Sequence, residues 1–312
     1  MQYRNLGRTG LQVSVMGIGA GGPSRLGQHD IVRTEAESAA LVLRGLDAGI
    51  NFIDTAEAYR TEEIVGAAVA QRDRSQIVIS TKKRLRGENI TRTELRAGLH
   101  DSLRRLGTDY VDVYHLHGLK PEQYDYYRQE ILPAMQDLRQ EGKIRFIGVT
   151  ENWSGDLAHK MLKRAVHDGC WDVIMVGFNL LNQTARESVL AAAIEKDIGV
   201  LIMFAIRRAL SQREKLKTTI QRLIESGEID PQDIDRENPL SFLVESGAAP
   251  SIADAAYRFC RDEPGTHVIL SGTGNPEHLD ANLAAFARPP LPPEISARLK
   301  HIFRGAHSVT GG

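Results

Sequence analysis

The chain has 312 residues, of which 42% are hydrophobic and 25% are charged, as in an ordinary soluble globular protein. Its 39 Lys and Arg residues and 40 Asp and Glu residues nearly cancel, to a formal net charge of -1, so the charge does not favour nucleic acid or an anionic membrane as a partner. No apolar run approaches the ~18 residues of a membrane span, and no secretory leader opens the sequence. We therefore expect a cytoplasmic protein, with Cys170 and Cys260 as reduced, buried thiols.

The first predicted elements are two short alternating runs, residues 3–6 and 11–14, on either side of a Gly-containing turn. This pattern predicts a β-hairpin. Eight short runs rich in Val and Ile follow, and each is apolar throughout, which is typical of strands covered on both faces. These runs are residues 15–18, 50–53, 77–80, 111–114, 144–149, 173–176, 200–203 and 268–270.

Helical patterns lie between these runs, with apolar residues recurring on one stripe of each segment. Thr91 or Thr93 is the predicted N-cap of the second helix, and Thr184 is the predicted N-cap of the fourth. The predicted helices are residues 35–48, 93–106, 121–141 and 184–196.

Eight buried parallel strands with helical crossovers predict an α/β protein, a closed (β/α)8 TIM barrel that forms one domain over residues 1–312, with the hairpin able to plug its bottom. A doubly wound open sheet is the alternative. That fold requires a glycine-rich turn leading directly into a helix. The glycine-rich residues 17–22 are instead followed by Pro23, and helical periodicity resumes only near Thr34. We therefore interpret residues 17–22 as a loop at the barrel mouth.

The step between the seventh and eighth predicted strands is about twice as long as the others, so residues 212–251 are interpreted as a large insertion. Its acidic residues lack the central Gly and the closing Glu of a calcium loop, and no metal site is predicted. We expect a solvated surface, which is compatible with a lid over the mouth.

Four reactive side chains follow the second, third and fourth predicted strands. Asp54 ends the second strand and Tyr59 lies five residues later, Lys82 ends the third, and His117 ends the fourth. Function in such a barrel sits at the carboxyl ends of the strands, and neighbouring strands are ~4.8 Å apart. These side chains can therefore meet at one mouth.

Together these groups can move a proton onto a carbonyl oxygen. A free phenol has a pKa of about 10, and a close ammonium is expected to lower that pKa. Lys82 can act in this way on Tyr59, while Asp54 keeps Lys82 protonated. His117 can donate to a substrate oxygen and orient the carbonyl. Reduction of a carbonyl by hydride requires this chemistry.

Each of these residues also has an ordinary structural interpretation. A Tyr in a loop usually packs, a Lys at a strand end is usually solvated, and a lone His is more often structural than catalytic. Their coincidence at successive strand ends favours catalysis. Nearby, we interpret His115 as a core residue, Asp112 as a cap or pairing partner within the scaffold, and Lys83 as solvent-facing.

Five segments resemble the aldo-keto reductase family, and the resemblance covers nearly the whole chain. They are residues 3–14, 51–66, 104–112, 142–149 and 272–282. The resemblance implies a barrel oxidoreductase that uses NADPH or NADH without a metal. The residues that match the family's catalytic tetrad, in which the Tyr is the proton donor, are Asp54, Tyr59, Lys82 and His117.

The resemblance also implies a site for the nicotinamide at the barrel mouth. Phe204 matches the aromatic residue on which the family stacks that ring. The family's Ser-Asn pair, which grips the carboxamide, is here Thr150-Glu151, and its usual Gln is Met175, so the hydroxyl is kept and the amides are not. The other cofactor residues predicted here are Gly19, Ala20 and Ala205.

Arg207 and Arg208 can contact the cofactor's pyrophosphate, because guanidinium groups suit phosphate oxygens; a surface charge pair is the alternative. NADPH-using members of the family often place Lys or Arg at positions matching Gly272, Gly274 or His278. Without a fixed cation there, discrimination in favour of NADPH is expected to be weaker. NADP(H) is still favoured because the family commonly uses it, and NAD(H) or dual use stays open. The residues predicted to bind the adenosine are Gly272, Thr273, Asn275, His278 and Asn282.

We therefore expect an enzyme that transfers hydride between NAD(P)H and a small-molecule aldehyde or ketone, or a sugar or other alcohol in reverse. One alternative is a nicotinamide-binding regulatory or redox-sensing subunit with little turnover, which the altered carboxamide grip keeps open. Another is a barrel lyase in which Lys82 forms a Schiff base. Specificity is expected to lie in residues 21–28, in the insertion and in the tail after Arg304. The sequence carries no signature of the oligomeric state.

Overall fold

The structure, a computed structural model, describes residues 1–29, 32–85, 87 and 89–312. Eight parallel strands close into a barrel in the order β10-β3-β4-β5-β6-β7-β8-β9, because the last barrel strand pairs with the first. Each overlaps one of the eight predicted runs, so the predicted (β/α)8 barrel is confirmed. The strands are β3 (Met16–Gly19), β4 (Phe52–Asp54), β5 (Val78–Arg84), β6 (Val111–Leu119), β7 (Ile144–Glu151), β8 (Val173–Gly177), β9 (Gly199–Met203) and β10 (Val268–Ser271).

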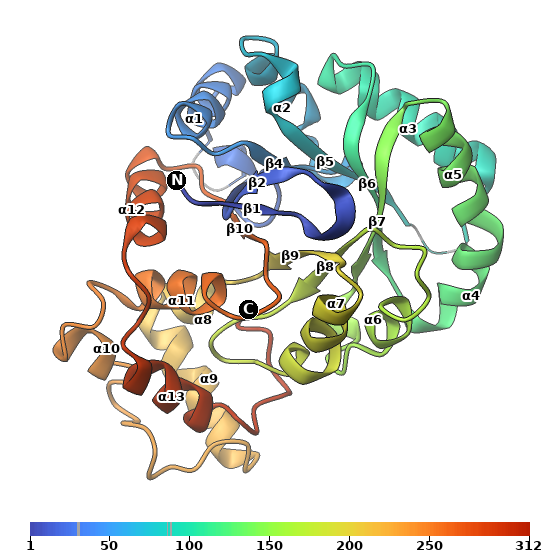
Figure 1. The fold of residues 1–312 in the computed structure, drawn as a ribbon. Coiled ribbons are helices and arrows are strands. Elements are labelled where there is room, and N and C mark those ends of the chain that lie inside the picture. The colour runs from blue at the N-terminus through green and yellow to red at the C-terminus, as the bar shows by residue number, and fades with distance from the viewer. Residues whose placement is uncertain (30–31, 86, 88) are drawn as a thin grey trace.

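The predicted N-terminal hairpin is present as β1 (Tyr3–Asn5) and β2 (Gln12–Ser14), which pair antiparallel. It lies across one end of the barrel, in blue in Figure 1. Its apolar side chains Leu6, Leu11 and Val13 are buried in one cluster with side chains from inside the barrel, such as Phe52 and Leu201. The hairpin therefore plugs the amino-terminal end, as the sequence indicated.

Helices surround the barrel (Figure 1). They are α1 (Glu35–Asp47), α2 (Glu62–Val69), α3 (Arg92–Leu106), α4 (Tyr124–Tyr126), α5 (Leu132–Gln140), α6 (Lys160–Ala165), α7 (Ala191–Glu195), α8 (Arg208–Ser211), α9 (Arg213–Glu225), α10 (Phe242–Glu245), α11 (Ile252–Arg261), α12 (Pro276–Ala287) and α13 (Pro293–Ile302). The predicted helix 121–141 is divided by a π-helical turn at Tyr127–Ile131. Pro133 follows in the first turn of α5 and cannot donate the backbone hydrogen bond that would continue an α-helix.

Helix starts match the prediction only in part. Thr91 caps α3, and its hydroxyl and the Glu94 carboxylate form a capping box. Thr93 lies within the first turn of that helix. The predicted N-cap at Thr184 is wrong, because its hydroxyl donates to Asn182 Oδ1 at 2.6 Å instead of accepting from the helix that follows.

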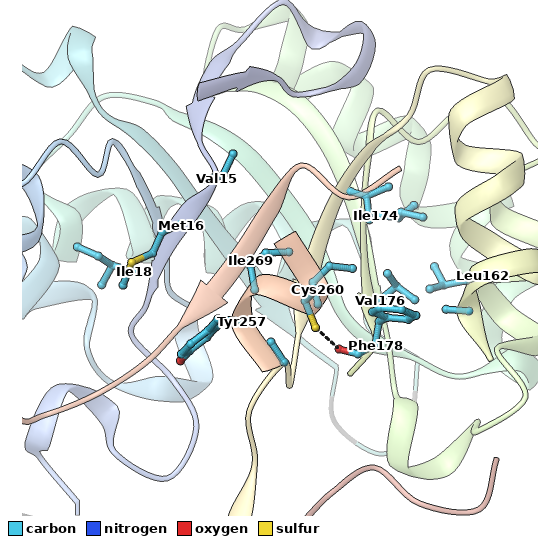
Figure 2. Packing of buried hydrophobic residues seen from close by; sticks show 14 of the residues in the cluster. Val15, Met16, Ile18, Leu162, Ile174, Val176, Phe178, Tyr257, Cys260 and Ile269 are labelled. Carbon is cyan, nitrogen blue, oxygen red and sulfur yellow. Dashed lines mark hydrogen bonds between the residues drawn. The ribbon is translucent and has the colours of Figure 1, made fainter. Parts of the chain in front are cut away.

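The outer core lies between the barrel and its helices. Outward side chains of the strands meet apolar side chains of the helices, as Figure 2 shows for β3, β8 and β10 against α6 and α11. The thiol of Cys260 is buried there and lies 3.7 Å from the Phe178 carbonyl. Cys170 is half-buried, so the expectation of two fully buried thiols holds only for Cys260.

The insertion between β9 and β10 contains α9 and α10. It is not entirely a solvated surface, because α9 buries Leu216, Ile220 and Leu223. Polar contacts link it to α13 and to the C-terminal tail. Glu228 accepts hydrogen bonds from the backbone of that tail, and Asp233 lies 3.2 Å from His301. Among the described residues, no helix is long and apolar enough to cross a membrane.

Candidate active site

Asp54 and Lys82 form a buried ion pair at the carboxyl ends of β4 and β5. Lys82 Nζ lies 2.5 Å from Asp54 Oδ2 and also donates to the Thr55 carbonyl at 2.8 Å, while the Ser80 hydroxyl donates to Asp54 Oδ1 at 2.8 Å. Neither charged side chain is appreciably exposed. Strand alternation places the side chains of Asp54, Ser80 and Lys82 on the interior side of the barrel. The ion pair is therefore fixed beneath the mouth.

Tyr59 stands over this pair in a short 3₁₀ turn, Glu57–Tyr59, that follows β4. Lys82 Nζ lies 4.9 Å from the centroid of the Tyr59 ring. A Cβ atom added to Gly21 would come within 2.5 Å of that ring. Only glycine therefore lets the loop after β3 pack against the Tyr59 ring and hold it over Lys82.

His117 completes the cluster from β6. Its Nε2 lies 3.4 Å from the Tyr59 hydroxyl, and the two rings meet edge to face with their centroids 5.4 Å apart. Burial, and then the charges of Lys82 and Arg84, lower the pKa of His117 to about 3. The imidazole is therefore neutral at neutral pH, and it can donate one hydrogen bond to a bound oxygen.

His115 lies directly below, as the sequence predicted for a core residue. It is fully buried, and its ring fills the space over Gly148 that a Cβ would occupy. Within the described chain neither ring nitrogen has a hydrogen-bond partner. Burial, with Lys82 and His117 adding to it, lowers the pKa of His115 well below its ordinary value, so this ring is also neutral.

The electrostatics of the buried cluster differ from the expectation in one respect. Burial raises the pKa of Tyr59, and Asp54 adds to this, so that together they outweigh the lowering by Lys82. Burial lowers the pKa of Lys82, but the charge and hydrogen bonds of Asp54 and Tyr59 raise that pKa by more than burial lowers it. The net pKa lies above its ordinary value, so Lys82 stays an ammonium. Burial also raises the pKa of Asp54, against the opposing charge of Lys82. Tyr59 is therefore a protonated phenol held beside a cation.

The Thr150-Glu151 pair separates at the end of β7. Thr150 faces the interior side, and its hydroxyl accepts from the Gly118 backbone at 2.7 Å. Glu151 faces outward, where its carboxylate lies 2.8 Å from His159 Nδ1 and accepts from the Gly177 backbone at 2.7 Å. Burial raises the pKa of Glu151, and His159 opposes this. The Glu151 carboxylate is thus turned away from the mouth.

Phe204 directly follows β9, with φ at +65°, a conformation that is rare outside glycine. Trp153 stacks near one side of its ring, at 6.1 Å between centroids, and the Arg207 guanidinium lies 4.3 Å from its centroid. Within the described chain the buried Nε1 of Trp153 has no partner. Met175 is buried inside the barrel, and Ala205 is buried beside Phe204.

The two arginines after β9 have different surroundings. Arg207 is half-buried and donates to the Thr310 hydroxyl at 2.5 Å. Burial, and then the charge of Arg208, lower the pKa of Arg207. Arg208 is exposed. Neither residue forms an ion pair within the described part of the chain, so both a phosphate contact and a surface role remain compatible with Arg208.

The remaining predicted cofactor residues lie around β3 and β10. Gly19 pairs with Asp54 across the sheet, and the Ala20 amide donates to the Asp54 carbonyl at 2.8 Å. Asn275 caps α12 through its side chain. Four predicted cofactor residues of the segment after β10 are partly or fully exposed, namely Gly272, Thr273, His278 and Asn282. Asn282 donates to the Ser271 hydroxyl at 2.9 Å.

Two scaffold expectations have different outcomes. Asp112 pairs with Arg74 at 2.9 Å and with Arg145 at 2.8 Å, which confirms its structural role. The expectation for Lys83 is wrong, because its side chain is only 11% exposed and pairs with Glu57 at 3.2 Å. Its side chain lies over Gly98 of α3, in space that a Cβ atom there would occupy.

Several residues at this end of the barrel had no part in the sequence prediction. Trp153 and His159 stack behind the mouth, with centroids 6.1 Å apart. Asn179 and Asn182 are buried and donate to the C-terminal tail at the Thr310 and Val309 carbonyls. Two asparagines in an otherwise apolar stretch were the available signal, because buried amides are almost always hydrogen-bonded.

The chain is similar to known proteins over most of its length. A sequence model of the Aldo/keto reductase family matches residues 16–304. The chain is 30% identical over 304 residues to the aldo-keto reductase YhdN of Bacillus subtilis (strain 168). The aligned region covers 90% of this chain and 87% of that protein. It is 37% identical over 209 residues to the L-galactose dehydrogenase of Arabidopsis thaliana, with 64% of each chain covered.

A solved structure shows the same fold. The holo form of the aldo-keto reductase AKR11C1 from Bacillus halodurans superposes with a TM-score of 0.76 and covers 99% of this chain and 97% of that one. The two sequences are 24% identical, so this likeness is one of fold.

Proposed function

The chain belongs to the aldo/keto reductase family, and from that premise we propose that it transfers hydride between NAD(P)H and an aldehyde or ketone, or a sugar or other alcohol in reverse, with Tyr59 as the proton donor. The observation that carries the proposal is the cluster at the mouth. A protonated phenol, a buried ammonium and a neutral imidazole lie in contact there. A cluster of this kind serves proton transfer to an oxygen.

The residues at the mouth fit a nicotinamide dinucleotide. Phe204 is a partly exposed aromatic ring at the mouth, Thr150 has a hydroxyl on the interior side, and Trp153 has a buried N–H that no described residue satisfies. The cofactor, when bound, supplies or accepts the hydride. NADP(H) is favoured on the family's habit, and NAD(H) or dual use stays open.

The side chains of the cluster have distinct roles in this proposal. Tyr59 delivers its proton to the carbonyl oxygen during reduction and recovers it during oxidation. The Lys82 ammonium stabilises the phenolate that is left, because opposite charges interact strongly where water is excluded. Asp54 keeps Lys82 charged and in place. His117 donates to the same oxygen and orients the carbonyl.

The substrate is proposed to be a small carbonyl compound or sugar. L-galactose dehydrogenase acts on a sugar by its name, and it is among the similar proteins. The Tyr59 hydroxyl and His117 Nε2 lie 3.4 Å apart, so a single oxygen of the substrate can contact both groups at the reacting end. The rest of the substrate would be selected by the loops of the mouth.

The experiment is a panel of aldehydes, ketones and sugars, run with NADPH and with NADH in both directions. We expect turnover of at least one class by the wild-type protein. Tyr59→Phe should lower kcat by roughly 10²–10⁴-fold, the usual contribution of a general acid, with cofactor affinity retained. Tyr3→Phe changes an exposed ring far from the mouth and serves as the matched control. Full turnover by Tyr59→Phe would remove this residue from its role.

A regulatory nicotinamide-binding subunit is the second candidate, and one observation favours it. Glu151 is turned outward and Met175 replaces an amide, so the carboxamide has fewer polar partners than is usual for the family. Cofactor binding without turnover across the whole panel would support this candidate. A Schiff-base lyase would require Lys82 to lose its proton, and the Asp54 pair opposes that.

A further inference from the structure

A second cationic feature lies at the mouth, apart from the Tyr59 cluster. A cavity of about 510 Å³ is lined by Gly22, Pro23, Arg25, His29 and Arg208. Ligand sites commonly have volumes of this order. The first four residues belong to the loop after β3, and Arg208 belongs to the start of α8. Among the described residues that line the cavity, none is acidic.

Two positions in the segment that follows β10 have no room for a side chain, because the loop after β3 packs against them. A Cβ on Gly272 would come within 2.8 Å of the Gly19 carbonyl, and a Cβ on Gly274 would collide with the Gly27 backbone. Positions 272 and 274 therefore cannot carry the cations that NADPH-using relatives are expected to have there. The loop that excludes these side chains is also the one that brings Arg25 to the cavity.

This loop is held in a defined shape. Arg25 and Leu26 have φ values of +44° and +58°, which are unfavourable for residues with a side chain. Leu26 is buried, and the Ser38 hydroxyl of α1 donates to its carbonyl at 2.7 Å. Gln28 donates to the same Ser38 hydroxyl at 2.9 Å. The buried anchor on α1 thus offsets the strain and fixes where Arg25 emerges.

Positive charge gathers at this place without a described counter-charge. Arg25 and Arg208 form no ion pair within the described part of the chain. Arg207 stands next to Arg208, which lowers its pKa, and Arg33 donates to the Gly274 carbonyl. Guanidinium groups that have no counter-charge among the described residues create, around one cavity, a field that favours a bound anion.

We propose that Arg25 and His29, together with Arg208, bind a phosphate group of the dinucleotide, so that the loop after β3 supplies the cation that the segment after β10 lacks. This inference rests on the proposed function, because it assumes that the protein binds a nicotinamide dinucleotide. β10 lies between β9 and β3 in the barrel. A dinucleotide that ran from Phe204 to the segment after β10 would pass the cavity that Arg25, His29 and Arg208 line.

The test is calorimetric titration of NADPH and of NADH into the full-length protein and its variants. Arg25→Ala should raise Kd tenfold or more for at least one dinucleotide, since a charge-assisted contact to phosphate is lost. Arg208→Ala should have a similar effect, and Arg25→Lys should restore part of the affinity. The matched control is Arg236→Ala, which removes an exposed arginine of the insertion. His29→Ala gives a second reading that leaves the strained Arg25 position unchanged.

The two dinucleotides distinguish the two phosphates. A loss confined to NADPH identifies the 2′-phosphate, and an equal loss for both identifies the pyrophosphate. Unchanged Kd values for both dinucleotides in Arg25→Ala, His29→Ala and Arg208→Ala would overturn the inference alone. Failure of the wild-type protein to bind either dinucleotide would overturn the proposed function itself, so the two failures are distinguishable.

Discussion

Tyr59 is a phenol whose protonation depends on opposing neighbours. The sequence suggested that Lys82 would lower its pKa, because the two residues converge at the mouth. Burial was not part of that prediction, and in the folded chain it acts in the opposite direction and prevails. In the proposed reaction the cation therefore stabilises the phenolate that would form during reduction, and it does not create phenolate beforehand.

This protonation state predicts different pH profiles for the two directions. Tyr59 donates only while protonated, so kcat for reduction should stay level from pH 6 to pH 9 and fall only above about pH 10. Oxidation requires the phenolate and should rise across the same range. Because the pKa of His117 is about 3, His117 adds no transition near neutrality. Initial rates in both directions across this range check the prediction.

A reduction rate that fell with a midpoint near pH 7 would contradict this account, since it would place the pKa of Tyr59 below its ordinary value. Replacing His117 with Gln keeps a neutral donor and is the matched variant. It should lower the rate without moving the alkaline limb, because that limb belongs to Tyr59.

At the scale of single elements, the strands were predictable and their immediate surroundings were less so. Alternation on β7 gives the reason. Thr150 on the interior side requires Glu151 on the exterior side, and that signal was present in the sequence. The partner of Glu151 was not, because His159 reaches it from eight residues away through a left-handed residue conformation. Side-chain partners across a loop depend on loop geometry, which apolar periodicity does not encode.

The helices show the same division. The segment 121–141 was recognised as helical from its apolar stripe, yet the π-helical turn before Pro133 was not. Thr184 has a residue type that suits a cap, but its hydroxyl is already bound to Asn182. The cluster around Tyr59 and Lys82 could be predicted because strand ends fix it, whereas Arg25 and His29 lie in an irregular loop that only the folded chain positions.

The insertion and the tail are joined by one carboxylate. Glu228 accepts from the backbone amides of His307 and Ser308 at 2.8 and 3.0 Å. Burial raises its pKa, but these hydrogen bonds, with those from the Ser308 and Ser226 hydroxyls, outweigh burial and lower the pKa to about 2. The insertion thereby holds the tail at His307 and Ser308.

Glu228→Gln should lower the free energy of unfolding by about 1–2 kcal/mol at pH 7, because hydrogen bonds to a charged acceptor are replaced by neutral ones. The folded-state pKa lies below the ordinary value, so this contribution is present above about pH 4.3 and is lost as the pH falls towards 2. Denaturant titrations of both proteins at pH 7 and pH 3 measure the difference. Glu245→Gln, at an exposed carboxylate of α10, is the control. A difference that stayed constant between the two pH values would show that charge is not its origin.

At the scale of the whole molecule, the apolar plug and the reactive side chains lie at opposite ends of the barrel. The hairpin seals the amino-terminal end with buried Leu6, and the reactive side chains lie at the carboxyl-terminal end. A change at the plug should therefore alter folding without altering the site.

Leu6→Ala should lower the free energy of unfolding by about 2–5 kcal/mol, since it leaves a cavity where the side chain packs against Gly199. We expect kcat/KM to stay within about twofold of the wild-type value. Tyr3→Ala, on the same hairpin but half exposed, should cost less than about 1 kcal/mol. A large loss of kcat/KM in folded Leu6→Ala would show that the two ends are coupled.

The position of the tail has a practical consequence for handling the protein. Gly312 lies against the Arg207 guanidinium, and the Ala209 amide donates to the Gly311 carbonyl at 2.9 Å. An affinity tag fused after Gly312 would emerge beside the catalytic opening, whereas one placed before Met1 would leave from the sealed side. Purified material meant for kinetic work should accordingly carry its tag at the front.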